Sequence, residues 1–278
     1  MHVSGSLTTL NFRSTTLNFF HHLRYPTTMR ILLSLVITVA AFCAPLLAAE
    51  PDYLPPKLLT GSIYDKPGGR LLFTFRRAAT QTGDVVSVLR EFNNPDGSLA
   101  ALERVRYERG RLVRFELDER QIGAVGNALV ELLPNQRQRI QFQYAMRSTR
   151  ADRPKRESET VREQILISDM LPGFMTDHWD ELARGETMQF RYIVVPRLET
   201  IAFKLKRESA GELRGKKVVR IKMAPSSRLI AQFLDPLVFT VEADPPHRIL
   251  QYWGRTTPKT RAGQSWNDLD ALTIFTWE

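Results

Sequence analysis

Apolar and polar side chains alternate with a period of two from residue 61 onward, and this alternation constrains the fold more than any other feature. Successive side chains of a β-strand point to opposite faces, so the pattern predicts strands with one buried face. Tight turn sequences such as Asn93–Gly97 separate the strands, because proline presets one backbone angle there and glycine accepts a positive one. Connections this short join antiparallel neighbours, and the sequence therefore predicts an antiparallel meander.

The expected strands continue to the end of the chain. They lie at residues 71–75, 85–89, 102–108, 112–117, 139–144, 161–167, 187–195, 200–206, 217–223, 236–242, 248–254 and 271–277. Residues 148–163 contain almost no apolar side chain and predict an exposed, mobile loop, with a charged hairpin tip as the alternative. The fold class that follows is α+β, mainly β: one large, curved, half-barrel-like antiparallel sheet with two or three helices packed on its concave face.

Two segments favour helices. The first is 170–184, for which Asp169 is a natural cap and Gly185 a natural stop. The second is 227–234, preceded by Pro225 and Ser226, with apolar residues on one stripe.

The first 49 residues contain no Asp, Glu or Lys and carry an apolar run from Ile31 to Ala49. A basic Arg30, an apolar stretch and small residues are typical of a secretory signal peptide, so residues 29–49 are interpreted as the signal and cleavage is expected after Ala49. Residues 1–28 then precede the true start at Met29. The remaining residues, 50–278, are expected to form a single periplasmic domain. The alternative is an uncleaved inner-membrane anchor at 31–49.

Composition excludes several chemistries. The only cysteine, Cys43, lies in the signal segment, so the domain has neither disulfide nor thiol chemistry. Without Arg13, Arg24 and Arg30 of the first 49 residues, the 39 basic and 30 acidic residues of the chain leave a net charge of 36 − 30 = +6. This basic excess is scattered through alternating segments, which is typical of a solvated face and also favours anionic lipid headgroups. Nucleic acid is not an expected partner of an exported protein, no cofactor motif is present, and a monomer is expected.

A histidine among acids, within the segment from Thr176 to Glu181, resembles a catalytic cluster. A helical projection separates the two types: His178 falls in an apolar stripe, and the acids fall on the opposite side. The simplest interpretation is an amphipathic helix that covers the sheet with a half-buried histidine. One alternative is that His178 orients a ligand inside an apolar cavity. The other is a hydrolase-like site that uses His178 with Asp268 or Asp270.

A metal site is not expected, because the domain has just two histidines, His178 and His247. Asp268 and Asp270 offer two oxygen ligands to calcium, although a turn entering the last strand explains them better. An apolar cleft between sheet and helices is the more favoured site. Its candidate lining residues are Phe174, Met175, His178, Trp179, Leu182, Leu229, Ile230, Phe233, Tyr252 and Trp253.

The second half, from the helix at 170–184 through "GETMQFRYIVV", "IAFKLKRE", "KVVRIKMAPSS" and "PLVFTVEADPPHRILQYWGR", resembles the periplasmic lipoprotein carriers of the LolA/LolB type and related bacterial periplasmic domains of unknown function. The resemblance covers roughly the last 110 residues and rests on the order of strands and helices. It implies that an acyl chain binds between sheet and helices, and it transfers no site residue. The charged segment 148–163 and the N-terminal strands depart from the carriers.

The leading hypothesis is a non-enzymatic periplasmic protein that binds a hydrophobic or amphipathic ligand, such as a lipid or an acyl chain. An envelope scaffold that binds another protein and no small ligand is the second hypothesis. The enzyme using His178 is the third.

Overall fold

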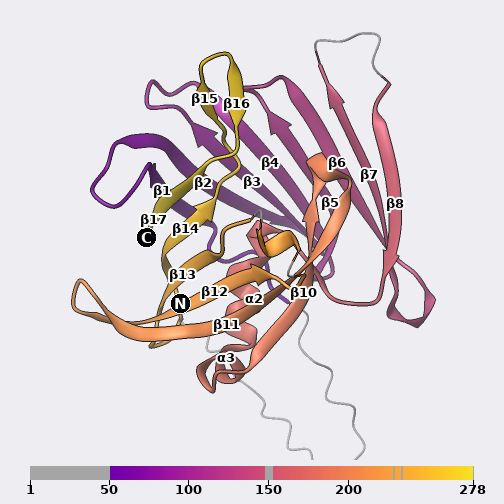
Figure 1. Cartoon of the computed structure of the whole chain (residues 1–278). Helices are drawn as coiled ribbons and strands as arrows, with labels where there is room; N and C mark the ends of the chain where they lie inside the picture. The colour runs from indigo at the N-terminus through magenta and orange to yellow at the C-terminus, as the bar shows by residue number, and fades with distance from the viewer. Residues whose placement is uncertain (1–50, 148–152, 228, 233, 278) are drawn as a thin grey trace, which may run out of the picture. The chain divides into compact units, whose positions relative to one another are not determined.

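The alternation of apolar and polar residues forms the strands of one large antiparallel sheet in a computed structural model of the chain (Figure 1). The structure describes residues 51–147, 153–227, 229–232 and 234–277. The expectations for residues 1–49, namely the upstream segment, the signal peptide or anchor and the cleavage point, lie outside these residues. Within the described ranges, no helix combines the length and apolarity that crossing a lipid bilayer requires.

The N-terminal half is an uninterrupted meander in which each strand pairs with the next. Its strands are β1 (Leu58–Tyr64), β2 (Leu71–Thr82), β3 (Val85–Asn93), β4 (Leu99–Glu108), β5 (Arg111–Glu119), β6 (Ala124–Leu132), β7 (Gln138–Met146) and β8 (Lys155–Val161), with a short turn η1 (Pro134–Gln136) before β7.

The C-terminal half begins with two short helices and continues the sheet. Its elements are β9 (Ile165–Leu166), η2 (Ser168–Met170), α2 (Leu171–Asp177), α3 (Trp179–Ala183), β10 (Thr187–Val194), η3 (Val195–Arg197), β11 (Glu199–Leu213), β12 (Lys216–Pro225), η4 (Ile230–Gln232), β13 (Leu237–Glu242), β14 (Ile249–Arg255) and β17 (Asp270–Thr276). A separate hairpin of β15 (Thr260–Ala262) and β16 (Ser265–Asn267) lies between β14 and β17.

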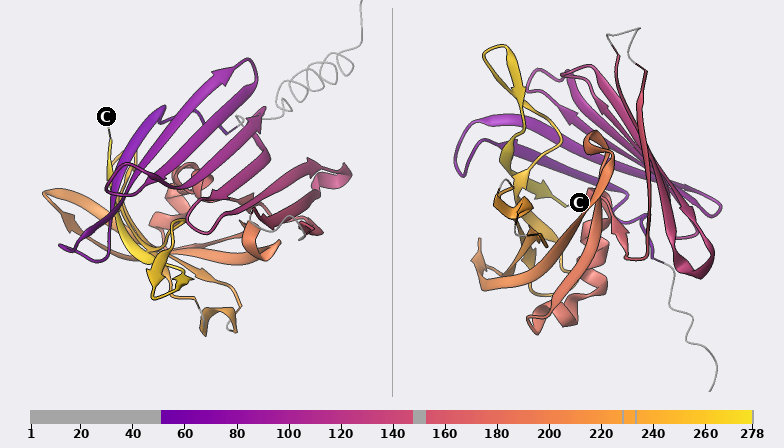
Figure 2. Two further views of the ribbon diagram at one scale, coloured as in Figure 1. Left: turned by 90° about the horizontal axis from the view of Figure 1, so that it is seen from above. Right: turned by 45° about the vertical axis from the view of Figure 1, so that its right-hand side comes forward.

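The two halves join in the middle of the sheet, where the first strand, β1, pairs with the last, β17. The 15-stranded sheet therefore runs β8-β7-β6-β5-β4-β3-β2-β1-β17-β14-β13-β12-β11-β10-β9. The two edge strands, β8 and β9, are consecutive along the chain, so the sheet curls back toward itself (Figure 2). Where the two ends of the sheet approach each other, the Glu159 carboxylate of β8 accepts a hydrogen bond from the Thr200 amide of β11 at 2.6 Å. The predicted class, a mainly β protein with a large curved antiparallel sheet, is confirmed.

The helices are shorter than predicted. The expected helix over 170–184 is broken at His178, whose backbone leaves the helical region (φ −110°, ψ 26°), and the break places Trp179 against the His247 ring at 3.9 Å between centroids. Of the expected helix over 227–234, the described residues contain a single turn, η4. Its apolar stripe stays partly in water, since Leu229 is 68% exposed, and so short a helix is unstable without burial.

The loop predicted over 148–163 is also corrected in part. Residues 155–161 form β8, an edge strand made almost entirely of polar and charged residues. Its backbone pairs with β7, and its side chains point into water on both faces along most of its length. Residues 148–152 lie outside the described part of the chain.

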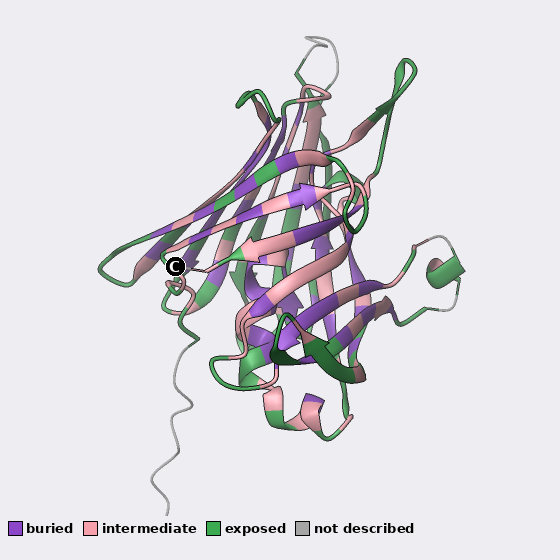
Figure 3. Cartoon of the chain, turned by 90° about the vertical axis from the view of Figure 1, so that its left-hand side faces the viewer, coloured by how far each residue is buried: buried purple, intermediate pink, exposed green. Residues whose placement is uncertain are grey.

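Buried side chains alternate with exposed ones along most strands, as the banding in Figure 3 shows. The buried face of the sheet points to the interior, where α2 and α3 fill one end. There the Phe174 ring packs edge-on against Phe190 of β10 at 5.5 Å. Among the described residues no helix fills the rest of the interior, and this leaves room for the site described next.

Candidate functional site: a two-sided internal cavity

A cavity of about 490 Å³ lies inside the curved sheet, with walls from both halves of the chain. This volume is within the range of about 300–1,000 Å³ that small-molecule sites occupy. The wall formed by β11, β12 and β13 is entirely apolar, with Ile201, Phe203, Met223, Leu237 and Phe239 facing the cavity. The loop around η4 adds Ile230 and Leu234.

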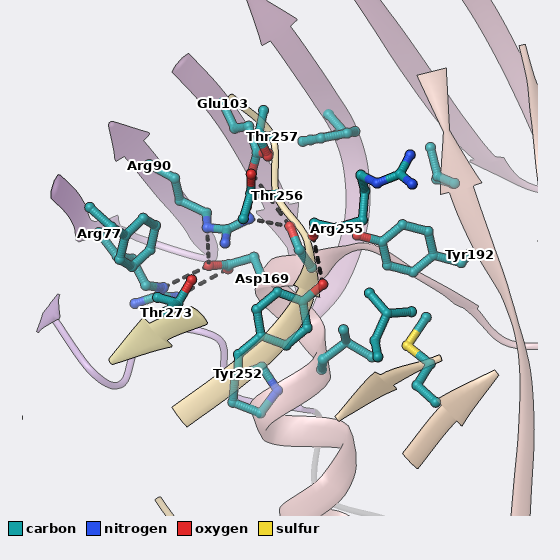
Figure 4. A pocket seen from close by; sticks show the side chains of 18 of the residues that line it. Arg77, Arg90, Glu103, Asp169, Tyr192, Tyr252, Arg255, Thr256, Thr257 and Thr273 are labelled. Atoms are coloured by element: carbon teal, nitrogen blue, oxygen red, sulfur yellow. Dashed lines mark hydrogen bonds and ion pairs between the residues drawn. The ribbon is translucent and has the colours of Figure 1, made fainter. Parts of the chain in front are cut away.

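The opposite wall, formed by β2, β3 and β4, is charged. Arg77 lies directly opposite Arg90 in the β2–β3 register, and Arg90 lies directly opposite Glu103 in the β3–β4 register. All three side chains face the cavity (Figure 4), and Arg77 and Glu103 are at most 5% exposed. A row of ionised groups across three central strands is costly unless every charge has a partner.

Asp169 of η2 supplies the partner of Arg77. The guanidinium donates from Nε to Oδ1 at 2.7 Å and from Nη2 to Oδ2 at 3.1 Å, which is the bidentate geometry of a strong ion pair. The Tyr107 hydroxyl donates to the same carboxylate at 2.9 Å. Burial, followed by the Asp169 charge, raises the pKa of Tyr107 well above its usual value, so the phenol stays a donor. Asp169 is therefore an interior ion-pair partner. The sequence-based prediction that it caps the helix is wrong, because Met170 occupies the N-cap of α2 and no side chain caps it.

Arg77 also fixes the segment that enters the sheet. Its Nη2 donates to the Tyr53 carbonyl at 2.7 Å, and its Nη1 bonds the carbonyls of Leu54 and Pro56. The Tyr53 ring in turn stacks on Tyr107 with 4.2 Å between centroids. One guanidinium thus connects β2, η2 and the entry segment.

Arg90 is held by Glu103 and by the Ser168 hydroxyl. Its guanidinium lies 5.2 Å from the centroid of Phe75 and 5.8 Å from that of Phe92, so its flat faces are also covered. Burial lowers the pKa of Arg90, but the Glu103 and Asp169 charges outweigh burial and raise it. The arginine is therefore a permanent cation at the cavity wall.

A second polar cluster bridges the two halves near the β15–β16 hairpin. Lys259 donates to Asp268 at 2.8 Å and lies 3.3 Å from Glu119 of β5. Glu119 also accepts a bond from the Tyr144 hydroxyl at 2.6 Å. Arg255 pairs with Asp270 at 2.9 Å and with Asp268.

The two walls together make the cavity amphipathic. The charges at the polar wall pair with one another, so the site has no strong preference for a charged ligand, while its hydroxyls and guanidinium edges offer hydrogen bonds. The apolar wall offers burial, worth about 25 cal/mol per Å² of apolar surface removed from water. Within the described residues, no group of three or more His, Cys, Asp or Glu side chains is placed to hold a metal ion.

The structure brings together only part of the predicted lining set. Ile230 and Tyr252 face the cavity. Phe174, Met175 and Leu182 do not; they are packed into the core between the helices and the sheet. The reason is that α2 and α3 pack directly against the sheet at their end of the interior and leave no space between. Phe233 lies outside the described residues.

The other four candidates also lie away from the cavity wall. His178 sits at the helix break with a side chain 32% exposed, 4.0 Å from Glu181, and Trp179 stacks on His247. Leu229 points into water. Trp253 follows the cavity-lining Tyr252 along β14 and so belongs to the outer face.

The predicted pairing of His178 with Asp268 or Asp270 is not assembled at the cavity. Asp268 lines the cavity, but His178 does not. Both aspartates are engaged by Arg255, and Asp268 also by Lys259. This is the pattern of a structural ion-pair network.

The charged wall was missed by sequence reasoning, although a signal for it exists. Phe73, Phe75 and Arg77 share one face of β2 by their period of two, and two of them are plainly apolar. A charged residue in the apolar phase of a strand, repeated at Arg90 and Glu103, marks a polar interior.

Comparison with known proteins gives a limited result. The sequence matches no protein-family model and no curated protein. A crystal structure that resembles it is the β-barrel-like protein of a domain of unknown function, DUF1849, from Brucella abortus, with 7% identity and a TM-score of 0.38 over 79% of this chain and 93% of that one. At this level of similarity no functional residue or activity can be transferred.

Proposed function

We propose that this protein is a non-enzymatic binder of an amphipathic lipid or acyl-chain ligand, held in the cavity between the two walls. The observation that carries the proposal is the division of one 490 Å³ cavity into an apolar wall of β11–β13 and a hydrogen-bonding wall of β2–β4. A hydrocarbon chain fits the first wall and a polar head group fits the second. Periplasmic export, predicted from residues 29–49, places such a binder among membrane lipids.

The paired charges also bear on the chemistry. A catalytic group needs a pKa and a geometry matched to a reacting atom, and the ionisable groups at this wall are each engaged by a counter-charge. The arrangement is suited to orienting a head group and not to transferring a proton. This supports binding over the hydrolase hypothesis.

The test is direct binding by the purified chain. We expect native mass spectrometry to show a co-purified lipid mass, and the delipidated protein to enhance the fluorescence of a dansyl-labelled fatty acid. A chain that carries no lipid and leaves the probe fluorescence unchanged would overturn the proposal.

Two leucines in the η4 loop provide a matched pair of variants. Leu234 lines the cavity, whereas Leu229 is 68% exposed on the same loop. Leu234→Glu should weaken probe binding by about tenfold or more, because a charge then lies against the hydrocarbon chain. Leu229→Glu should bind like the wild type. Equal loss in both variants would place the probe outside the cavity.

A further inference from the structure

The outer face of the C-terminal half concentrates positive charge. Residues 199–225, the β11–β12 hairpin, contain eight Lys or Arg and three Glu, so this short segment supplies more than half of the chain's net charge of +9. Lys204, Lys206 and Arg220 point outward and are exposed. Within the part of the chain that the structure describes, none of the three has a carboxylate within ion-pair distance, and Lys222 reaches Glu208 at 3.8 Å.

Two of these lysines lie directly opposite each other. Lys206 of β11 pairs in register with Lys222 of β12. Like charges directly opposite across an antiparallel ladder destabilise it, so this pair works against the fold. Glu208 relieves the charge of Lys222, whereas Lys206 has no carboxylate within ion-pair distance among the described residues.

The same register continues into apolar and aromatic side chains, of which Leu272 is buried and the others are half-buried. Lys222 is opposite Val238, Val238 is opposite Trp253, Trp253 is opposite Leu272, and Leu272 is opposite Tyr64. Trp253 and Tyr64 are half-buried and face outward. Lysines beside tryptophan and tyrosine are the composition of protein surfaces at the membrane–water interface, where cations meet lipid phosphates and aromatic rings lie at head-group depth.

The matching surface of the N-terminal half is different. Arg106 of β4 and Arg114 of β5 are also opposite each other, but each has its own acid, Glu108 at 2.8 Å and Glu116 at 2.6 Å. These two arginines are neutralised locally, whereas Arg104 of β4 and Arg111 of β5 are exposed and have no ion pair among the described residues. The contrast between the halves therefore lies in the two opposed basic pairs: Arg106 and Arg114 each have a carboxylate, and Lys206 has none.

We propose that the outer face of β11–β14, with Lys204, Lys206, Arg220, Lys222 and Trp253, docks on an anionic lipid bilayer. The inner face of the same strands is the apolar cavity wall, with Ile201, Phe203 and Met223. Docking therefore sets the cavity one sheet thickness from the membrane. The docking surface is defined independently of the cavity and does not rest on the proposed ligand.

The experiment is co-sedimentation of the purified full chain with phosphatidylcholine vesicles that contain or lack phosphatidylglycerol. We expect binding to anionic vesicles that weakens as salt increases, and little binding to neutral ones. Segment 31–49 is common to every variant, so differences between variants report the surface alone. Equal binding to neutral and anionic vesicles, or none to either, would overturn the proposal.

Charge reversal at matched positions completes the test. Lys206→Glu with Lys222→Glu should weaken binding to anionic vesicles by about tenfold or more, since each basic residue contributes about fivefold near such a surface. Arg106→Glu with Arg114→Glu makes the same charge change on the other half and should shift binding by less than about threefold. Lys206→Arg with Lys222→Arg should retain binding.

Equal loss in both reversed variants would show attraction to net charge only and would sink the assignment to this face. Thermal unfolding of each variant identifies any that fails to fold, and the arginine variant keeps the charge where folding of the reversed one is impaired. Acyl-probe binding by the docking variants should stay at the wild-type level. That readout separates a failure of docking from a failure of the cavity proposal.

Discussion

The two halves of the sheet use the same alternation of residues in opposite ways. The N-terminal strands β2–β4 place Arg77, Arg90 and Glu103 inside and pair outer charges such as Arg76 and Arg106 locally. The C-terminal strands β11–β13 place only apolar side chains at the cavity, and Lys204 and Lys206 on their outer face have no ion pair among the described residues. One sheet, curled back toward itself, thereby acquires an amphipathic interior and an outer surface whose two halves differ in how their charges are paired. The period of two determines which face a residue occupies, while residue type determines what each face does.

Substitutions in the polar wall are expected to cause the largest loss of stability. Asp169→Ala leaves the Arg77 guanidinium and the Tyr107 hydroxyl buried without their shared acceptor. Removing one partner of a buried pair costs about 3–5 kcal/mol, so we expect a loss of that size in the free energy of unfolding by urea. Asp177→Ala, an exposed change on α2, is the control and should cost far less. Similar losses of unfolding free energy in both variants would show that the Asp169 network does not stabilise the fold.

Alkaline titration tests the coupling between the walls. Burial, and then the Glu103 charge across the cavity, raises the pKa of Tyr192 of β10 from 10.0 to about 12. Below pH 10 the tyrosine is protonated in both states and stability is retained. Between pH 10 and about 12 the unfolded chain loses the proton first, so the free energy of unfolding falls, by about 1.4 kcal/mol for each pKa unit.

Unfolding free energies measured across this pH range should therefore decline, and Tyr192→Phe should flatten the decline. Tyr53, whose pKa burial and the nearby Asp177 and Asp169 charges also raise to about 12, contributes to the decline as well, as do Tyr107, Tyr144 and Tyr252, whose pKa values burial also raises. A wild-type stability that stays constant to pH 12 would contradict the coupling.

The contact between the halves depends on a glycine. A Cβ on Gly126 of β6 would lie 2.5 Å from Cγ1 of Val195 in η3 and 2.7 Å from the Gln143 carbonyl oxygen. Gly126→Ala should therefore destabilise the protein by about 1–3 kcal/mol through overpacking, measured by chemical denaturation. Gly211→Ala on β11 meets no atom within 4 Å and should be close to neutral. A larger loss of stability for Gly211→Ala than for Gly126→Ala would show that η3 shifts to accommodate the added methyl group.

The smallest effect is expected on the outer face of the N-terminal half. Arg76 and Glu91 pair at 3.0 Å with side chains 49% and 29% exposed. Such pairs contribute about 0.2–1 kcal/mol. A double-mutant cycle with alanine at both positions measures this coupling, and a value above about 2 kcal/mol would show that the outer pairs share in holding the sheet.

Most of the sheet was predictable from sequence, although no strand was expected at β1 or β6, whereas the site was predictable only in part. Alternation is a local signal, so strands such as β2 and β7 follow from it directly. The break at His178 depends on the stacking of Trp179 on His247, a contact between residues far apart in sequence, and helical periodicity does not contain it. Of the predicted lining residues that the structure describes, only Ile230 and Tyr252 reach the cavity, because burial of an apolar helix face does not reveal whether it meets a core or a void.

The composition of β8 has one more consequence. A sheet edge presents unpaired backbone donors and acceptors and is a template for pairing with another chain. One edge here is Lys-Arg-Glu-Ser-Glu-Thr-Val, and the other, β9, is two residues long. Joining two copies through β8 would bury charged side chains, and β9 offers too little backbone to join. The run of charges that made this segment resemble a loop thus protects a 15-stranded sheet from growing into an aggregate.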